Sequence, residues 1–209
     1  MRRAIYAHLQ VWDPLGQMKL DEGLRYGGQT MLFVLAADGL AEGLLKLMDA
    51  VAQKGLGFVR LIYAGYTDGF EPDHFPFEVD IATMTADALE TGRICAIGPY
   101  TYAPTLDLKS EDVMLACVDL LGPDLGEAAP RGGAICLAAM RGSVADGLRA
   151  LLEAARADGQ EILSLEDVKD ASEHSEVFDF ETSVEELVKR ARVAPGPVFS
   201  DLIEYQRGG

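Results

Sequence analysis

Cysteine, histidine and tryptophan are scarce in this sequence of 209 residues, which contains three, three and one of them, respectively. The cysteines, Cys95, Cys117 and Cys136, are far apart, and each stands in apolar sequence. Their number and spacing exclude a disulfide framework and a CxxC metal site, and favour reduced core thiols in a cytoplasmic protein. The three histidines are equally scattered, so the sequence predicts no metal centre.

Long apolar runs and known catalytic motifs are also lacking. No stretch reaches the roughly 18 uninterrupted apolar residues that a membrane span requires, and the opening MRRAIYAHLQVWDP lacks the apolar segment of a signal peptide. The patterns GxSxG, HExxH, GxxxxGK[ST] and GxGxxG do not occur. We therefore expect no membrane association, no cofactor and no catalytic residues, and we favour a binding protein over an enzyme.

The charge balance is strongly acidic. The chain has 18 lysines and arginines against 34 aspartates and glutamates, a net charge of −16. This excludes nucleic-acid binding, which depends on clustered basic residues. Residues 1–104 carry a net charge of −5 and residues 105–209 carry −11. The acidic second half fits either a docking surface for a basic protein partner or a solvated surface, and the sequence leaves both open.

An internal repeat organises the chain. When residues 39–62 are placed over residues 143–166, seven of 24 positions are identical, whereas chance gives about two in such a composition. FPFEVD at 75–80 recurs as FDFETS at 178–183, at nearly the same offset. We therefore predict a duplication with two domains, residues 1–104 and residues 105–209.

Both copies predict the same order of elements. Apolar runs bounded by turn residues indicate strands, and apolar residues three and four apart indicate helices, the first helix of each copy ending before Gly55 or Gly159. The expected strands are residues 4–12, 30–37, 58–65, 75–81 and 93–102, then 112–121, 134–140, 162–168, 177–181 and 197–205; the second helices are residues 82–91 and 183–192. This order predicts an α+β fold of two ferredoxin-like βαββαβ modules, each with an extra leading strand, packed together.

The segment LAADGLAEGLLKLMDAVAQKGLGFVRL and its second-copy counterpart LAAMRGSVADGLRALLEAARADGQEILSL resemble the opening of ACT-type regulatory domains, over about 35 residues each. The resemblance implies that modules pair and bind amino acids or other small metabolites at the strand–helix loop, and a homodimer is one assembly that it leaves open. By the same resemblance, the ligand-binding positions would be Asp38, Gly39, Arg141, Gly142 and Ser143. Backbone N–H groups at a helix start favour an anion, although Ser143 is also a typical helix cap.

Differences between the copies point to further candidates. Tyr63, Tyr66, Tyr100 and Tyr102 stand near strand ends of the first copy, where they predict a rigid amphipathic surface for a ligand or a protein. Arg60 adds a cation for an acidic ligand. Half-buried strand aromatics are the alternative interpretation.

Two acidic hairpins, around His74 and His174, fit either a divalent metal or a solvated loop, and we favour the loop. The leading hypothesis is therefore a cytoplasmic, non-catalytic protein that binds a small metabolite and regulates in response to it. One alternative is an acidic protein of the immunity or antidote type that neutralises a basic protein partner. A small enzyme with an inter-lobe cavity is a second alternative.

Overall fold

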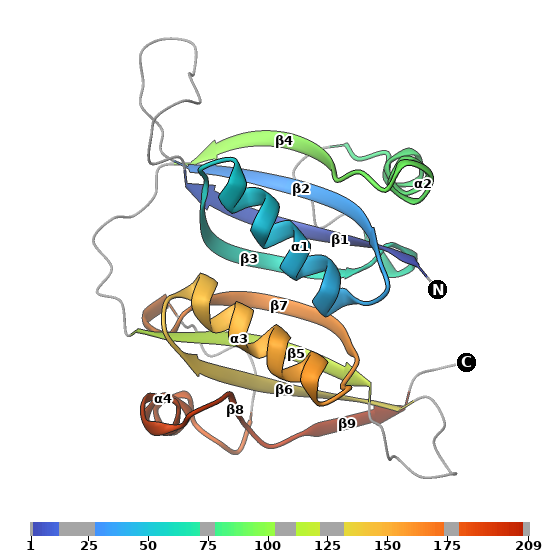
Figure 1. The fold of residues 1–209 in the computed structure, drawn as a ribbon. Coiled ribbons are helices and arrows are strands. Elements are labelled where there is room, and N and C mark those ends of the chain that lie inside the picture. Colours follow the sequence, from blue (N-terminus) through green and yellow to red (C-terminus); the bar gives the residue numbers. More distant parts are fainter. Residues whose placement is uncertain are drawn as a thin grey trace. The chain divides into compact units, whose positions relative to one another are not determined.

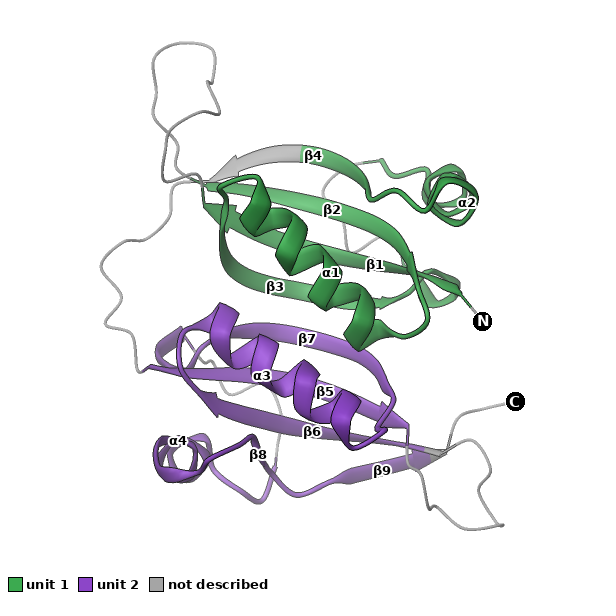
Figure 2. Cartoon of the chain, in the orientation of Figure 1, with its two compact units in different colours: residues 1–107 green, residues 108–209 purple. Residues whose placement is uncertain are grey.

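The computed structural model describes residues 2–12, 28–71, 78–102, 112–121, 132–173 and 180–206. The chain divides into two compact units, Met1–Asp107 and Leu108–Gly209 (Figure 2). Each unit combines an antiparallel sheet with two α-helices, so the fold is α+β (Figure 1). Within the described ranges, no helix has the length and apolar character needed to cross a membrane.

Unit 1 has four strands in the order β4-β2-β1-β3, and all neighbours are antiparallel. Its elements are β1 (Arg3–Trp12), β2 (Gly28–Ala37), α1 (Leu40–Gln53), β3 (Gly57–Tyr66), the 3-10 turn η1 (Thr67–Gly69), α2 (Ile81–Thr91) and β4 (Cys95–Tyr102). Helix α1 joins β2 to β3, and β1 lies between these two strands.

Unit 2 has the same order of elements, except that its last strand is in two pieces. These elements are β5 (Val113–Leu121), β6 (Gly132–Arg141), α3 (Val144–Ala157), β7 (Ile162–Asp170), the 3-10 turn η3 (Ala171–Glu173), α4 (Val184–Val193), β8 (Val198–Phe199) and β9 (Ile203–Gln206). Strand β5 pairs with β6 and β7, and both β8 and β9 pair with β6.

The leading strand is central in each unit, not an addition to a four-stranded module. Strand β1 is hydrogen-bonded to β2 on one side and to β3 on the other, and nearly all its side chains are buried. The prediction of a strand at residues 75–81 was wrong for residues 78–81, the part of this range that the structure describes. Residues 78–80 form no strand, because the Asp80 side chain caps α2 by accepting the N–H of Thr83 at 3.0 Å. In unit 2, residues 180 and 181 likewise lie outside any strand.

The two longer helices follow the apolar pattern of the sequence. The predicted apolar residues of α1 are buried: Leu40, Leu44, Leu47, Met48 and Val51. In Figure 1, α1 lies across one face of the unit 1 sheet. Gly43 and Gly147 bring α1 and α3 close to their sheets, since an added Cβ would overlap the side chain of Ile5 or Met114. Gly55 and Gly159 follow the two helices with φ of 72° and 68°, a conformation that favours glycine.

Candidate functional site

The register of unit 1 arranges the other face of its sheet, opposite α1, in four rows. Each row runs across β4, β2, β1 and β3 through directly paired residues. Row 1 is Cys95, Val34, Tyr6 and Gly65; row 2 is Ile97, Leu32, His8 and Tyr63; row 3 is Tyr100, Thr30, Gln10 and Arg60; row 4 is Tyr102, Gly28, Trp12 and Gly57.

Rows 1 and 2 form the core beneath α2. Tyr6, Leu32 and Val34 are buried with Ala88 of the helix, and the half-buried Tyr63, Cys95 and Ile97 pack around them. The ring of Tyr6 stacks on that of Tyr63, with centroids 5.4 Å apart, and meets Phe70 edge-on at 5.0 Å. Such pairs add to the stability that burial alone supplies.

Rows 3 and 4 lie beyond the residues that pack against α2, and we call them the Arg60 patch. Its described side chains are those of Gln10, Trp12, Thr30 and Arg60, which are half-buried. The backbone of β4 continues both rows, placing Tyr100 opposite Thr30 and Tyr102 opposite Gly28. Three predicted ligand residues, Arg60, Tyr100 and Tyr102, therefore share these rows, and Tyr63 borders them from row 2.

The two aromatic rings next to row 3 lie differently. The ring of Tyr63 extends over Gly65 of row 1, away from row 3, where an added Cβ would come 3.0 Å from the ring. The indole of Trp12 lies against Gly57 of row 4, where the corresponding distance is 3.3 Å. The hydrogen-bonding side chains of Gln10 and Arg60 therefore lie in the row next to Trp12, and the Tyr63 ring is turned away from them.

Tyr66 does not belong to this surface, which corrects the grouping of Tyr63 with Tyr66. The two are three residues apart in a regular part of β3, so alternation turns them to opposite faces. The Tyr66 hydroxyl accepts the N–H of Leu40 at 3.3 Å, and the Arg3 guanidinium carbon lies 3.4 Å from the centroid of its ring. Tyr66 therefore supports the start of α1.

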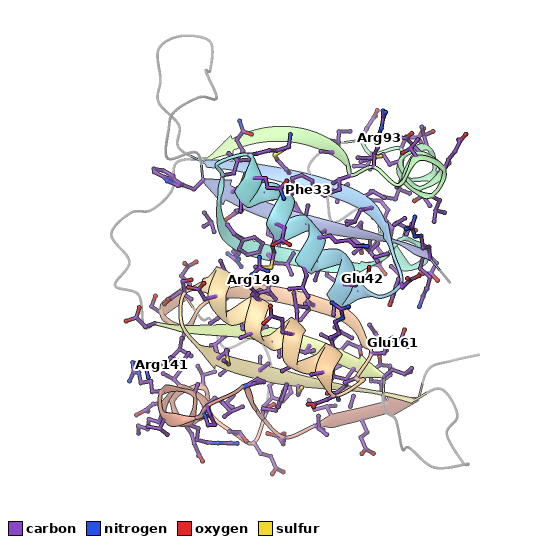
Figure 3. All side chains as sticks on the ribbon, viewed as in Figure 1. Phe33, Glu42, Arg93, Arg141, Arg149 and Glu161 are labelled. Atoms are coloured by element: carbon purple, nitrogen blue, oxygen red, sulfur yellow. The ribbon has the colours of Figure 1, made fainter. Side chains whose placement is uncertain are left out.

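The strand–helix loops are closed by local hydrogen bonds. In the first loop, Gly39 is the N-cap of α1, and the exposed Asp38 donates its N–H to Glu42 Oε2 at 3.2 Å; Figure 3 labels Glu42 in the first helical turn. Because Tyr66 and Glu42 take N–H groups of Leu40 and Asp38, this loop retains less capacity for an anion.

The second loop is a capped turn. Ser143 accepts the N–H of Asp146 at 3.2 Å and donates its hydroxyl to Asp146 Oδ2 at 2.6 Å. Gly142, with φ of 124°, donates its N–H to the Asp112 carbonyl at 2.7 Å, and Arg141 is an exposed residue at the end of β6 (Figure 3). These contacts match the helix-capping interpretation of Ser143.

The matching rows of unit 2 carry different chemistry. On the α4 side of this sheet, Asp119 occupies the place of Gln10, Ser164 that of Arg60, and Glu166 that of Tyr63. The Tyr205 hydroxyl donates a 2.5 Å hydrogen bond to Asp119 Oδ2. A carboxylate therefore replaces the amide of Gln10, and a hydroxyl replaces the guanidinium of Arg60. We call the surface around Asp119 and Tyr205 the Asp119 patch.

Unit 2 also contains a strained bulge beside this surface. Asp167 has φ of 51° within β7, and its carboxylate binds the Nζ of Lys169 at 2.5 Å. Lys169 is buried, so the ion pair compensates a charge that would otherwise be costly inside the protein. Asp119, Glu166, Asp167 and Lys169 were not among the predicted site residues, because only the strand register brings them near one another.

Burial changes the pKa values of one histidine and two cysteines in these sheets. His8 is 5% exposed, and desolvation lowers its pKa to about 4, so its imidazole is neutral at pH 7. Desolvation, together with nearby acidic side chains, raises the pKa of Cys117 and Cys136 to about 12. These thiols are protonated and unsuited to nucleophilic work.

The described residues form no metal cluster, and one cavity among them is small. No group of three or more His, Cys, Asp or Glu side chains there is placed to hold a metal ion, and His74 and His174 lie outside the described ranges. A cavity of about 30 Å³ in unit 2 lies between α3 and the sheet near Phe199. This volume holds water molecules but not a metabolite.

Comparisons with protein-family models, curated proteins and solved structures find no match for this chain.

Proposed function

We propose that this protein is a non-catalytic small-metabolite-binding protein with a regulatory role, and that its ligand binds at the Arg60 patch of unit 1. One observation carries the proposal: the strand register gathers Arg60 with Gln10 and Trp12, and it places the β4 positions Tyr100 and Tyr102 in the same rows. A few polar groups set among aromatic side chains are the usual lining of a small-molecule site.

The difference between the units supports a ligand role for this surface. At their β1 and β2 positions, the rows that pack beneath α2 and α4 are mostly apolar in both units, as at Leu32 and Leu137. Only at the β3 positions do Lys169 and Glu166 of unit 2 replace Gly65 and Tyr63. Rows 3 and 4 differ in charge, with Gln10 and Arg60 in one unit and Asp119 and Ser164 in the other. Packing constrains the first set, whereas a ligand would constrain the second.

We further propose that the units derive from a duplicated ferredoxin-like module related to ACT-type domains. The supporting features are the βαβ unit split by a central antiparallel strand, the matched element order and the paired glycines Gly43 and Gly147. Under this proposal, the leading strand fills the sheet position that the third strand of a ferredoxin-like module would occupy.

The test is thermal unfolding in the presence of a panel of carboxylic acids, amines, nucleosides and sugars. A ligand that binds only the folded protein raises its Tm. Gln10→Leu should abolish the shift, whereas Asp119→Asn, at the matching position of unit 2, should retain it. If no compound shifts the Tm, or if Gln10→Leu responds like the wild type, the proposal is wrong.

The Asp119 patch favours a second candidate, an acidic protein module that captures a basic protein partner. Here Asp119 and Glu166 replace the Gln10 and Tyr63 of unit 1, within the half of the chain that carries the net charge of −11. Acidic surfaces accelerate capture of basic partners in a salt-dependent way. A partner retained at low salt by the wild type, but lost from the Asp119→Asn and Glu166→Gln double variant, would favour this candidate.

A further inference from the structure

We propose that the ligand of the Arg60 patch is a carboxylate attached to an aromatic or heteroaromatic ring, and that Arg60 is its anion-binding residue. This inference rests on the proposed function and adds the chemical class of the ligand. It comes from the chemistry of row 3 and from the Trp12 ring in the neighbouring row 4.

Row 3 offers a fork of donors for a carboxylate. Arginine presents parallel N–H groups that match the two oxygens of a carboxylate, and it keeps its charge at every physiological pH. Gln10 is paired directly with Arg60, and Thr30 is paired with Gln10, so an amide and a hydroxyl continue the same row. A carboxylate at Arg60 would therefore have further hydrogen-bonding groups beside it.

The neighbouring Trp12 favours a ring on the same ligand. Trp12 is half-buried, and its indole Cδ1 would lie 3.3 Å from a Cβ added at Gly57, so the ring lies over that glycine in the row next to Arg60. Rigid aromatic side chains contribute contact area at little entropic cost, and they prefer planar, apolar groups. An aliphatic acid would use Arg60 but not this ring.

The arrangement is specific to unit 1. At the place of Arg60 unit 2 has Ser164, and at the place of Gln10 it has Asp119, whose carboxylate would repel an anion. The sheet position is the same, so the change of side chains reverses the preferred charge of the ligand. One chain thus contains both the site and an internal reference that should not bind the same compound.

Trp12 makes the test direct, because it is the single tryptophan of the chain and lies in row 4 of the patch. Its fluorescence emission is measured during titration with benzoate, with benzylamine, which has a ring but the opposite charge, and with acetate, which has the charge but no ring. We expect saturable quenching by benzoate in the millimolar range, at least tenfold weaker binding of acetate and none of benzylamine. N-acetyltryptophanamide, titrated in parallel, corrects for collisional quenching.

Variants then assign the anion site. Arg60→Met keeps the apolar stem and should abolish the benzoate response, while Arg60→Lys keeps the charge and should weaken it several-fold. Arg156→Met, an exposed arginine of α3, is the matched control and should leave it unchanged. If Arg60→Met does not fold, as judged by its Tm, the comparison of wild type with Arg60→Lys decides.

The outcomes separate this inference from the proposed function. Benzoate binding that is equal in wild type and Arg60→Lys, or binding of benzylamine at least as tight as that of benzoate, overturns the carboxylate assignment. So does a lack of saturable quenching by benzoate. In each case, if another compound shifted the Tm of the wild type but not that of Gln10→Leu, the Arg60 patch would still be a ligand site, for a different class of compound. Without such a shift, both proposals fail.

Discussion

The hydroxyl of Tyr205 donates a 2.5 Å hydrogen bond to Asp119, linking the last strand of unit 2 to its central strand across β6. The ring of the same tyrosine covers Gly133, where an added Cβ would overlap it. Tyr205→Phe keeps the ring and removes only the hydrogen bond. Because the acceptor is a half-buried carboxylate, we expect the free energy of unfolding to fall by about 1–2 kcal/mol. Urea denaturation measures it, and an unchanged midpoint would show that water replaces the hydroxyl without loss.

Acid should destabilise the protein through His8. Burial lowers the pKa of His8 to about 4 in the folded protein, while in the unfolded chain it is near 6.5. As the pH falls from 7 toward 4, the unfolded state therefore binds a proton first, and stability decreases. The contribution of neutral His8 to the free energy of unfolding is fully present above pH 6.5, and at most about 3 kcal/mol of it is lost at low pH. Comparing pH-dependent urea denaturation of wild type and His8→Leu isolates it, since the variant should lose less stability between pH 7 and pH 4.5.

Matched alanine substitutions at Gly43 and Gly147 should have different effects. Alanine favours a helix by about 1 kcal/mol over glycine. At Gly43, the added methyl chiefly meets the terminal Cδ1 of the buried Ile5 side chain, and the Cβ of Ala37 lies 3.1 Å away. At Gly147, it meets the Met114 Cβ, which is fixed to the backbone of β5. Because a side-chain end yields more easily than a Cβ, we expect Gly43→Ala to lose less free energy of unfolding than Gly147→Ala, which should lose about 1–3 kcal/mol. Thermal unfolding of both variants checks the order, and equal losses would contradict it.

Ser143→Ala should weaken α3 because the Ser143 side chain caps it through Asp146. The expected loss is about 1 kcal/mol in the free energy of unfolding. Ser143→Asp preserves a capping oxygen and serves as the control, although it also places a carboxylate beside Asp146. If instead a compound of the Tm panel shifted the wild type but not Ser143→Ala, this loop would have a binding role.

The three thiols should differ in accessibility more than in acidity. Cys117 and Cys136 are buried and have pKa values near 12. Cys95 is half-buried, and desolvation and a 3.0 Å hydrogen bond to Asp87 raise its pKa to about 11. At pH 8, we expect slow labelling of Cys95 by iodoacetamide and none of the other two until the protein is denatured. Mass spectrometry of labelled peptides measures this, and rapid labelling of Cys117 would contradict the buried position.

Local patterns predicted the elements well because they depend on neighbours in the sequence. The spacing of Leu40, Leu44 and Leu47 and the glycine after each helix located α1 and α3. The pairing partners of a strand depend on the whole sheet. The sequence therefore predicted β1 as an extra leading strand and did not place it between β2 and β3. The near-continuous burial of β1 is a property of the folded sheet, which the local sequence pattern did not show.

The candidate site shows a second limit of pattern reading. Arg60 and Tyr63 are three residues apart, so strict alternation puts them on opposite faces. The register of β3 against β1 shifts between His8 and Leu9, and this bulge returns Arg60 to the face of Tyr63. No such shift separates Tyr63 from Tyr66, and Tyr66 lies under α1. A bulge of this kind has no clear signature in residue type, so grouping these residues required the structure.

The interrupted outer strands have a consequence for behaviour at high concentration. Strand β4 shifts its register at Gly98, with φ of 125°, and continues with Pro99, which has no N–H to donate. In unit 2, the chain leaves the ladder between β8 and β9, and Ser200 Oγ accepts the N–H of Leu137 at 2.9 Å. Along β4, and along β8 and β9, the described backbone therefore offers another molecule an interrupted row of amide groups. Such interruptions disfavour strand addition and amyloid growth at these two edges.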